Sequence, residues 1–302
     1  MKFNKISIFI ALVTLLFANS ISAESSNRFA RENNNYSSLR IASASVAISQ
    51  VLSAMGQELV ARPTTRYPLP KEYQNLPEIG NSHAPDIEKI LVTKTQLLIG
   101  DQLFKSSLEK TIAGHDIELF LVDTSSYDKF TQSIAALGKK IGKEKEATKI
   151  IKTINSPIKK YKGKKTNKTI AILFGASESN QLATENSYVG SLVKVLGGKN
   201  IVNSIAQKDK NILSKAENGY VNFNVEQILA NQPDIIIRFG HGNVDAATKS
   251  FEKLFNENPA FKNLKATKNK KVYDLDSAIF GVSANLRISE ALDQLGKIIY
   301  EK

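Results

Sequence analysis

The chain of 302 residues contains no cysteine and no tryptophan, and it has only three histidines. Without cysteine there can be no disulfide, no thiolate metal site, no iron–sulfur cluster and no cysteine nucleophile. The absence therefore excludes every enzyme class that depends on a thiol.

The content of apolar and charged residues fits a folded, basic protein. Hydrophobic residues make up 42% of the chain, which is enough to bury a core, and the length fits one large domain or two medium ones. Lysine and arginine number 41 against 29 acidic residues, a net charge of +12. This balance suits an anionic ligand, an acidic surface or nucleic acid, and it is equally typical of solvated lysine-rich helices.

Residues 1–23 have the three regions of a secretory signal. Lys2 and Lys5 are followed by the apolar run 6–18 and by small residues up to Ala23. The run is short for a membrane span, so the sequence predicts cleavage before Glu24, with an uncleaved anchor as the alternative. No cysteine is present to carry a lipid. The expected location is a periplasm, or the exterior if the protein is secreted.

The rest of the chain divides into two α/β segments joined by a helical one. Residues 24–38 are polar and predict a flexible lead-in, and residues 39–126 alternate short apolar runs with helical patterns. Residues 127–160 carry apolar side chains at helical spacing and predict one long rigid spine helix. Residues 161–302 return to the alternating pattern. The predicted fold is therefore α/β, with two Rossmann-like lobes and a ligand cleft between them.

Four segments resemble the iron-complex substrate-binding proteins of ABC importers, and among these the heme-binding components of Gram-positive heme uptake systems. They are SASVAISQVLSAMG (43–56), LPEIGNSHAPDIEKI (76–90), SYVGSLVKVLGGKNIV (187–202) and NVEQILANQPDIII (224–237). The resemblance extends over residues 39–302. It implies a binding protein, not an enzyme, that carries heme as its transported ligand and passes it to an ABC permease.

The resemblance places heme-facing residues at His83 and His241. His83 stands near the start of a helix where relatives often have methionine, and His241 follows a late strand of the second lobe. Heme iron accepts axial imidazoles from opposite faces, so one histidine from each lobe would complete a six-coordinate site. Asn81 or Ser82 is the expected cap of the helix at His83. His115, in a glycine turn, is interpreted as an ordinary surface residue.

Five further residues are candidates for contacts with the heme plate and its propionates. Ser45 and Val46 begin a predicted helix whose free N–H groups could accept a carboxylate. The others are Arg66, Tyr67 and Tyr188. Arg238 precedes His241 on a predicted strand, and the sequence leaves open whether it faces the cleft or the sheet.

Other functions have weaker support in the sequence. A ferric-siderophore receptor is the main alternative, although it gives no reason for one histidine on each lobe. A zinc or manganese carrier would need more ligands than three separated histidines supply. The Gly-x-Ser-x-Gly motif of hydrolases is incomplete after Ser177. No aromatic platform and no recognised nucleic-acid motif accompanies the basic segment 159–168, so we expect no nucleic-acid partner. We also expect a monomer, with an upstream heme donor as a further partner.

Overall fold

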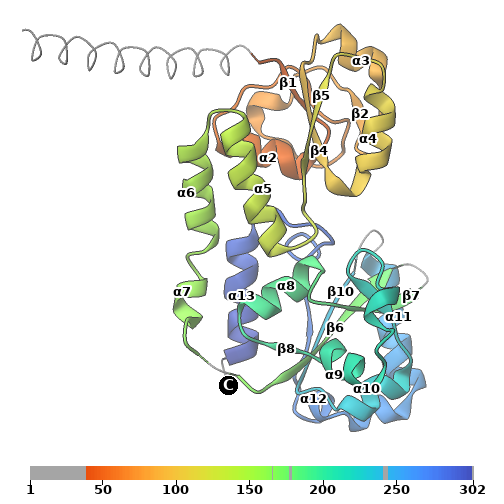
Figure 1. Cartoon of the computed structure of the whole chain (residues 1–302). Helices are drawn as coiled ribbons and strands as arrows, with labels where there is room; N and C mark the ends of the chain where they lie inside the picture. The colour runs from red at the N-terminus through yellow and green to blue at the C-terminus, as the bar shows by residue number, and fades with distance from the viewer. Residues whose placement is uncertain (1–38, 165, 177–178, 241–243, 301–302) are drawn as a thin grey trace, which may run out of the picture. The chain divides into compact units, whose positions relative to one another are not determined.

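A computed structural model describes residues 39–164, 166–176, 179–240 and 244–300 (Figure 1). The predicted signal and lead-in lie outside these residues. The compact unit that begins at Ile41 consists of two α/β lobes. None of the helices in this part of the chain is both long enough and apolar enough to cross a bilayer.

The first lobe contains a parallel sheet of three strands in the order β1-β4-β5. Its strands are β1 (Ile41–Ser43), β4 (Leu97–Asp101) and β5 (Glu118–Val122), and its helices are α2 (Val46–Ala54), α3 (Ile87–Val92) and α4 (Lys105–Ile112). Short 3-10 helices are η1 (Lys71–Tyr73) and η2 (Gln102–Phe104), and a hairpin is formed by β2 (Gly80–Asn81) and β3 (Ala84–Pro85). Beside β1, Ala61 forms an isolated parallel bridge with Ala42.

The second lobe contains a mixed sheet in the order β11-β10-β6-β7-β9, with β8 also paired to β6. Its strands are β6 (Thr169–Ala176), β7 (Ser179–Ala183), β8 (Lys199–Asn200), β9 (Tyr220–Asn222), β10 (Ile235–Gly240) and β11 (Val272–Asp274). Its longer helices are α8 (Tyr188–Val195), α9 (Ile201–Lys208), α10 (Val225–Asn231), α11 (Val244–Glu257) and α13 (Ile288–Tyr300). The short ones are η3 (Leu213–Lys215), η4 (Pro259–Asn263) and α12 (Lys265–Lys268).

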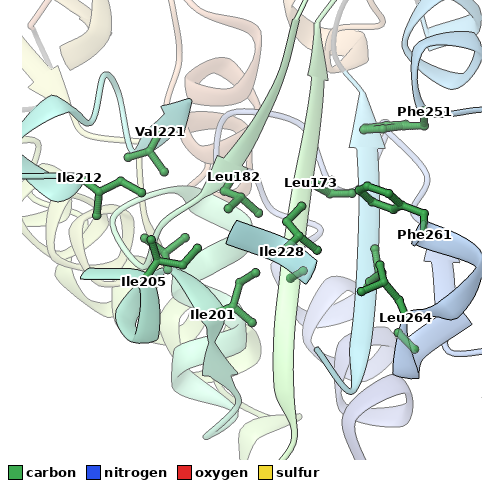
Figure 2. Packing of buried hydrophobic residues seen from close by; sticks show 14 residues of the cluster. Leu173, Leu182, Ile201, Ile205, Ile212, Val221, Ile228, Phe251, Phe261 and Leu264 are labelled. Atoms are coloured by element: carbon green, nitrogen blue, oxygen red, sulfur yellow. The ribbon is translucent and has the colours of Figure 1, made fainter. Parts of the chain in front are cut away.

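A cluster of aliphatic and aromatic side chains joins one face of the second sheet to its helices (Figure 2). Leu173 and Leu182 come from neighbouring strands, while Phe251 and Phe261 come from α11 and η4, and all four are at most 3% exposed. A fully buried side chain of this size contributes about 1.5–3 kcal/mol to folding. This packing fixes β6 and β10, and with them the strand ends that precede residues 177 and 241.

The predicted single helix over 127–160 is three helices in the structure. They are α5 (Tyr127–Lys140), α6 (Glu144–Ile154) and α7 (Ile158–Tyr161). Gly142 adopts a left-handed φ of +69° between the first two, and α5 packs against α6. The connection between the lobes therefore contains a helical hairpin where a continuous spine was expected.

Candidate functional site

The turn after β1 brings Ser45 and Val46 to the carboxyl edge of the first sheet. Ser43 Oγ accepts a hydrogen bond from Ser49 Oγ at 2.9 Å, and the Oγ atoms of Ser43 and Ser49 both donate to the Ser45 carbonyl. Ser45 is the N-cap residue of α2, but its hydroxyl caps no helix N–H. Ser45 is 8% exposed and Val46 is half-buried, so at most a small part of this turn is open to a ligand.

His83 lies at the tip of the β2–β3 hairpin, next to that turn. Ser82 Oγ donates to the Ala44 carbonyl at 2.6 Å, which attaches the hairpin to the start of α2. The N–H groups of His83 and Ala84 both donate to Asn81 Oδ1 at 3.0 Å. The His83 side chain is exposed. The structure therefore brings together three residues that the sequence predicted for one site: Ser45, Val46 and His83.

The expected helix start at His83 is wrong in detail. The N-cap of α3 is Asp86, whose carboxylate accepts from the N–H groups of Glu88 and Lys89. Asn81, the expected cap, closes the hairpin turn instead. Pro85 belongs to β3 and precedes the helix, because its hairpin pairing with Gly80 leaves Asp86 as the first residue able to cap.

Two residues that the sequence did not single out contact His83. The rings of His83 and Phe104 meet edge to face, with centroids 4.3 Å apart and an angle of 60° between the planes. Ser107 Oγ donates to the His83 carbonyl oxygen. Phe104 ends η2 and Ser107 lies in α4, and no sequence pattern connects them to a hairpin more than twenty residues earlier.

Arg66 and Tyr67 form an exposed pair on the segment before the hairpin. The Arg66 guanidinium lies 5.5 Å from the centre of the Tyr67 ring, and Tyr67 is 61% exposed. This segment is connected to the hairpin because the Thr64 N–H donates to the Gly80 carbonyl at 2.7 Å. Both side chains are accessible, as the prediction of a rim position requires.

Tyr188 is not a rim residue. Its side chain is fully buried at the start of α8, and its hydroxyl lies 3.5 Å from the Ile279 carbonyl oxygen. Burial raises the pKa of this phenol well above its ordinary value. Its ring fills the protein interior, so a ligand cannot contact it without repacking the core.

His241 lies outside the described residues, but the strand leading to it is described. Arg238, whose orientation the sequence left open, pairs with Asp274 through Nε at 2.7 Å and Nη2 at 2.5 Å. Its guanidinium also lies 5.0 Å from the ring centre of Phe255 in α11. Arg238 therefore connects β10 to β11 and α11.

Aromatic side chains gather where β6 and β10 end, just before His241. The Phe174 ring lies 4.5 Å from the Tyr220 ring and 5.3 Å from the Phe239 ring, measured between centroids. All three are buried, and burial raises the pKa of the Tyr220 phenol. These residues were missed, although the carboxyl ends of strands in open α/β sheets are the usual place for a ligand.

Two cavities among the described residues lie away from the residues predicted for the site. One cavity of about 290 Å³ lies between α2 and α6, and another of about 250 Å³ lies beside α9 and α10. None of the residues predicted for the site lines either cavity. Among described residues no group of three or more histidine or acidic side chains is arranged to hold a bare metal ion.

Residues 41–279 match the periplasmic binding protein family, and the chain belongs to this family. Its members are substrate-binding proteins of transport systems that act outside the cytoplasm, so the protein is a binding component and not an enzyme. The two-lobed α/β fold expected from the sequence is confirmed.

The relatives narrow the type of importer. The chain is 30% identical over 275 residues to the high-affinity heme uptake system protein IsdE of Staphylococcus aureus, covering 90% of each chain. The crystal structure of IsdE complexed with heme matches 87% of this chain and 99% of its own, with a TM-score of 0.72. An ABC transporter substrate-binding protein from Listeria monocytogenes matches with 32% identity, a TM-score of 0.74 and the same coverage. The resemblance stated from the sequence is confirmed at the level of the family.

Proposed function

We propose that the protein binds heme outside the cytoplasm and delivers it to an ABC permease. The observation that carries this proposal is the similarity over 90% of the chain to IsdE, a heme uptake protein, together with an exposed histidine at the tip of the β2–β3 hairpin. His83 would ligate the iron from the first lobe and His241 from the second. The cleaved signal at residues 1–23 would release the mature protein into a periplasm or to the exterior.

Residues around His83 supply the other contacts that heme needs. Arg66 offers a cation for a propionate and Tyr67 an exposed ring, while Val46 and the Ser45 turn lie beside the histidine hairpin. In the second lobe, the buried rings of Phe174 and Phe239 pack together at the ends of β6 and β10, the second of which precedes residue 241. No covalent bond within the ligand is made or broken, so these residues only bind and orient it.

A ferric-siderophore carrier is the alternative function. Crystal structures of Staphylococcus aureus SirA, including its complex with staphyloferrin B, share the fold with a TM-score of 0.68 at 19–20% identity. Such a ligand binds through its own chelating groups and requires no axial histidine. The two functions therefore differ in what the loss of His83 or His241 does to the spectrum of the bound iron.

The test is a hemin titration of the mature protein followed by absorption spectroscopy. We expect saturation at one hemin per protein with a six-coordinate low-spin spectrum, and a weaker or five-coordinate spectrum in His83→Ala and in His241→Ala. His115→Ala is the matched control, because His115 is also exposed and lies in a turn after α4. A titration without saturation, accompanied by tight binding of a ferric siderophore, would favour the alternative.

A further inference from the structure

The segment that follows β4 holds His83 together with the hairpin's own Asn81. Phe104 packs the edge of one ring against the face of the other, at 4.3 Å between centroids. Ser107 Oγ donates to the His83 carbonyl, and Asn81 Oδ1 accepts from the His83 N–H. The ring, the carbonyl group and the N–H group of His83 are therefore each held by another residue, although the side chain is exposed.

We propose that Phe104 is a positioning residue that holds the His83 imidazole in one orientation before the ligand arrives. This inference rests on the proposed role of His83 as an axial ligand. An exposed histidine samples several rotamers, and binding through it must restrict them. A ring contact that restricts these rotamers in the free protein would remove part of that cost and strengthen binding by preorganisation.

Asp101 fixes the position of Phe104. The Asp101 carboxylate accepts the Leu103 N–H at 2.9 Å and so caps the short helix η2, which ends at Phe104. Its second oxygen accepts from Thr124 Oγ1 at 2.6 Å, and Asp101 is 7% exposed. The Phe104 ring is therefore held in place by the last residue of the central strand β4.

Thr124 extends this support toward the connection between the lobes. The Thr124 carbonyl accepts the Ala284 N–H at 2.8 Å, and Ala284 is fully buried just ahead of α13. The series of contacts from His83 through Phe104, Asp101 and Thr124 thus ends at a fully buried residue of the segment before α13.

The experiment compares Phe104→Leu and Ser107→Ala with two controls in the mature protein. Phe104→Tyr keeps the aromatic ring, and Leu103→Ala removes a side chain that is 53% exposed in the same turn. The first readout is the NMR signal of the His83 imidazole in the ligand-free protein, where the Phe104 ring shifts it. The second is the rate at which hemin is lost to excess apomyoglobin.

We expect Phe104→Leu to move the NMR signal of His83 toward that of a histidine without the Phe104 ring contact, such as His115. The rate of hemin loss should rise about threefold to tenfold. Ser107→Ala should speed hemin loss as well, while both controls keep the wild-type signal and rate. If hemin binding depends on His83 but Phe104→Leu leaves the NMR signal or the rate of hemin loss unchanged, the positioning role of Phe104 is refuted and the ligation by His83 stands. If His83→Ala leaves the hemin spectrum unchanged, the proposed ligation is itself refuted.

Discussion

Tyr67 and Tyr188 differ in how much of each side chain water reaches. Tyr67 is 61% exposed and stacks with Arg66, whereas Tyr188 is fully buried. Both stand beside predicted elements of the site, and a single sequence does not show which face of a helix start points inward. Burial decides their roles, because an exposed ring is available to a ligand and a buried one contributes to packing.

We predict that Tyr188→Ala lowers the free energy of unfolding by about 3–5 kcal/mol, since it removes a buried aromatic ring and leaves a cavity. Tyr67→Ala should change it by less than about 0.5 kcal/mol. Urea unfolding followed by circular dichroism measures both values. Equal effects of the two substitutions would contradict the assignment of Tyr188 to the core.

The raised pKa of the Asp101 carboxyl should make the free energy of unfolding depend on pH. Burial raises the pKa of this carboxyl, against the lowering effect of hydrogen bonds from Thr124 and Leu103. The folded state thus holds the proton more tightly than the unfolded chain, so Asp101 reduces stability as pH rises above the ordinary value of about 3.9 toward the raised pKa. We expect Asp101→Asn to gain stability relative to wild type across that window.

Urea unfolding between pH 3.5 and pH 7 tests this expectation. Asn keeps a carbonyl oxygen for the Leu103 N–H, so the substitution preserves the cap of η2. A constant difference between variant and wild type over the whole range would show that Asp101 titrates normally.

The helices between the lobes show why a sequence pattern can predict helix but miss where each helix ends. Apolar residues recur at helical spacing on both sides of Gly142, because α5 and α6 each present one face to a common core. The pattern therefore indicates helix correctly but does not show the reversal. The signals for the breaks were Gly142, which adopts a left-handed φ, and Pro157, which precedes α7.

Gly138 and Ala147 form the close contact of this hairpin. A Cβ atom on Gly138 would lie 2.4 Å from the Ala147 Cβ and 3.0 Å from the Lys143 carbonyl oxygen. We predict that Gly138→Ala lowers the free energy of unfolding by about 1–3 kcal/mol, because overpacking outweighs the better helix propensity of alanine.

A double-mutant cycle with Ala147→Gly isolates that contact. The double variant should recover part of the loss, since removing the Ala147 methyl makes room for the new one. Strictly additive effects in thermal or urea unfolding would show that the two positions do not oppose each other.

At the scale of the whole molecule, both lobes are built from strands and helices that alternate along the chain, but their sheets differ. The first sheet is entirely parallel, whereas the second contains β7, which pairs antiparallel with both β6 and β9. The alternation of apolar runs and helices was sufficient to predict two α/β lobes. It could not predict β7 and β9, because SNQLA (179–183) and YVN (220–222) have no strong strand pattern of their own.

A buried hydrogen bond joins the first of the connecting helices to the second lobe. The Tyr127 N–H at the start of α5 donates to Ser191 Oγ of α8 at 2.8 Å, and Ser191 is 3% exposed. We predict that Ser191→Ala lowers the free energy of unfolding by about 1–3 kcal/mol, because it leaves a buried N–H without an acceptor.

Thr148→Ala is the control for this loss. Like Ser191, Thr148 forms a hydrogen bond between its hydroxyl and a backbone group. The Thr148 hydroxyl donates to the Glu144 carbonyl, on an exposed helix face. We expect a change below about 0.5 kcal/mol there. If both substitutions have the same small effect, the contact between α5 and α8 does not stabilise the connection.

The central claim is axial ligation of heme iron by one histidine from each lobe. Electron paramagnetic resonance of the ferric hemin complex tests it most directly, because the low-spin signal of two imidazoles differs from the high-spin signal of a five-coordinate iron. We predict a low-spin signal in wild type and in His115→Ala, and a high-spin signal in His83→Ala and in His241→Ala. A low-spin signal that is unchanged in both of these variants would contradict the claim.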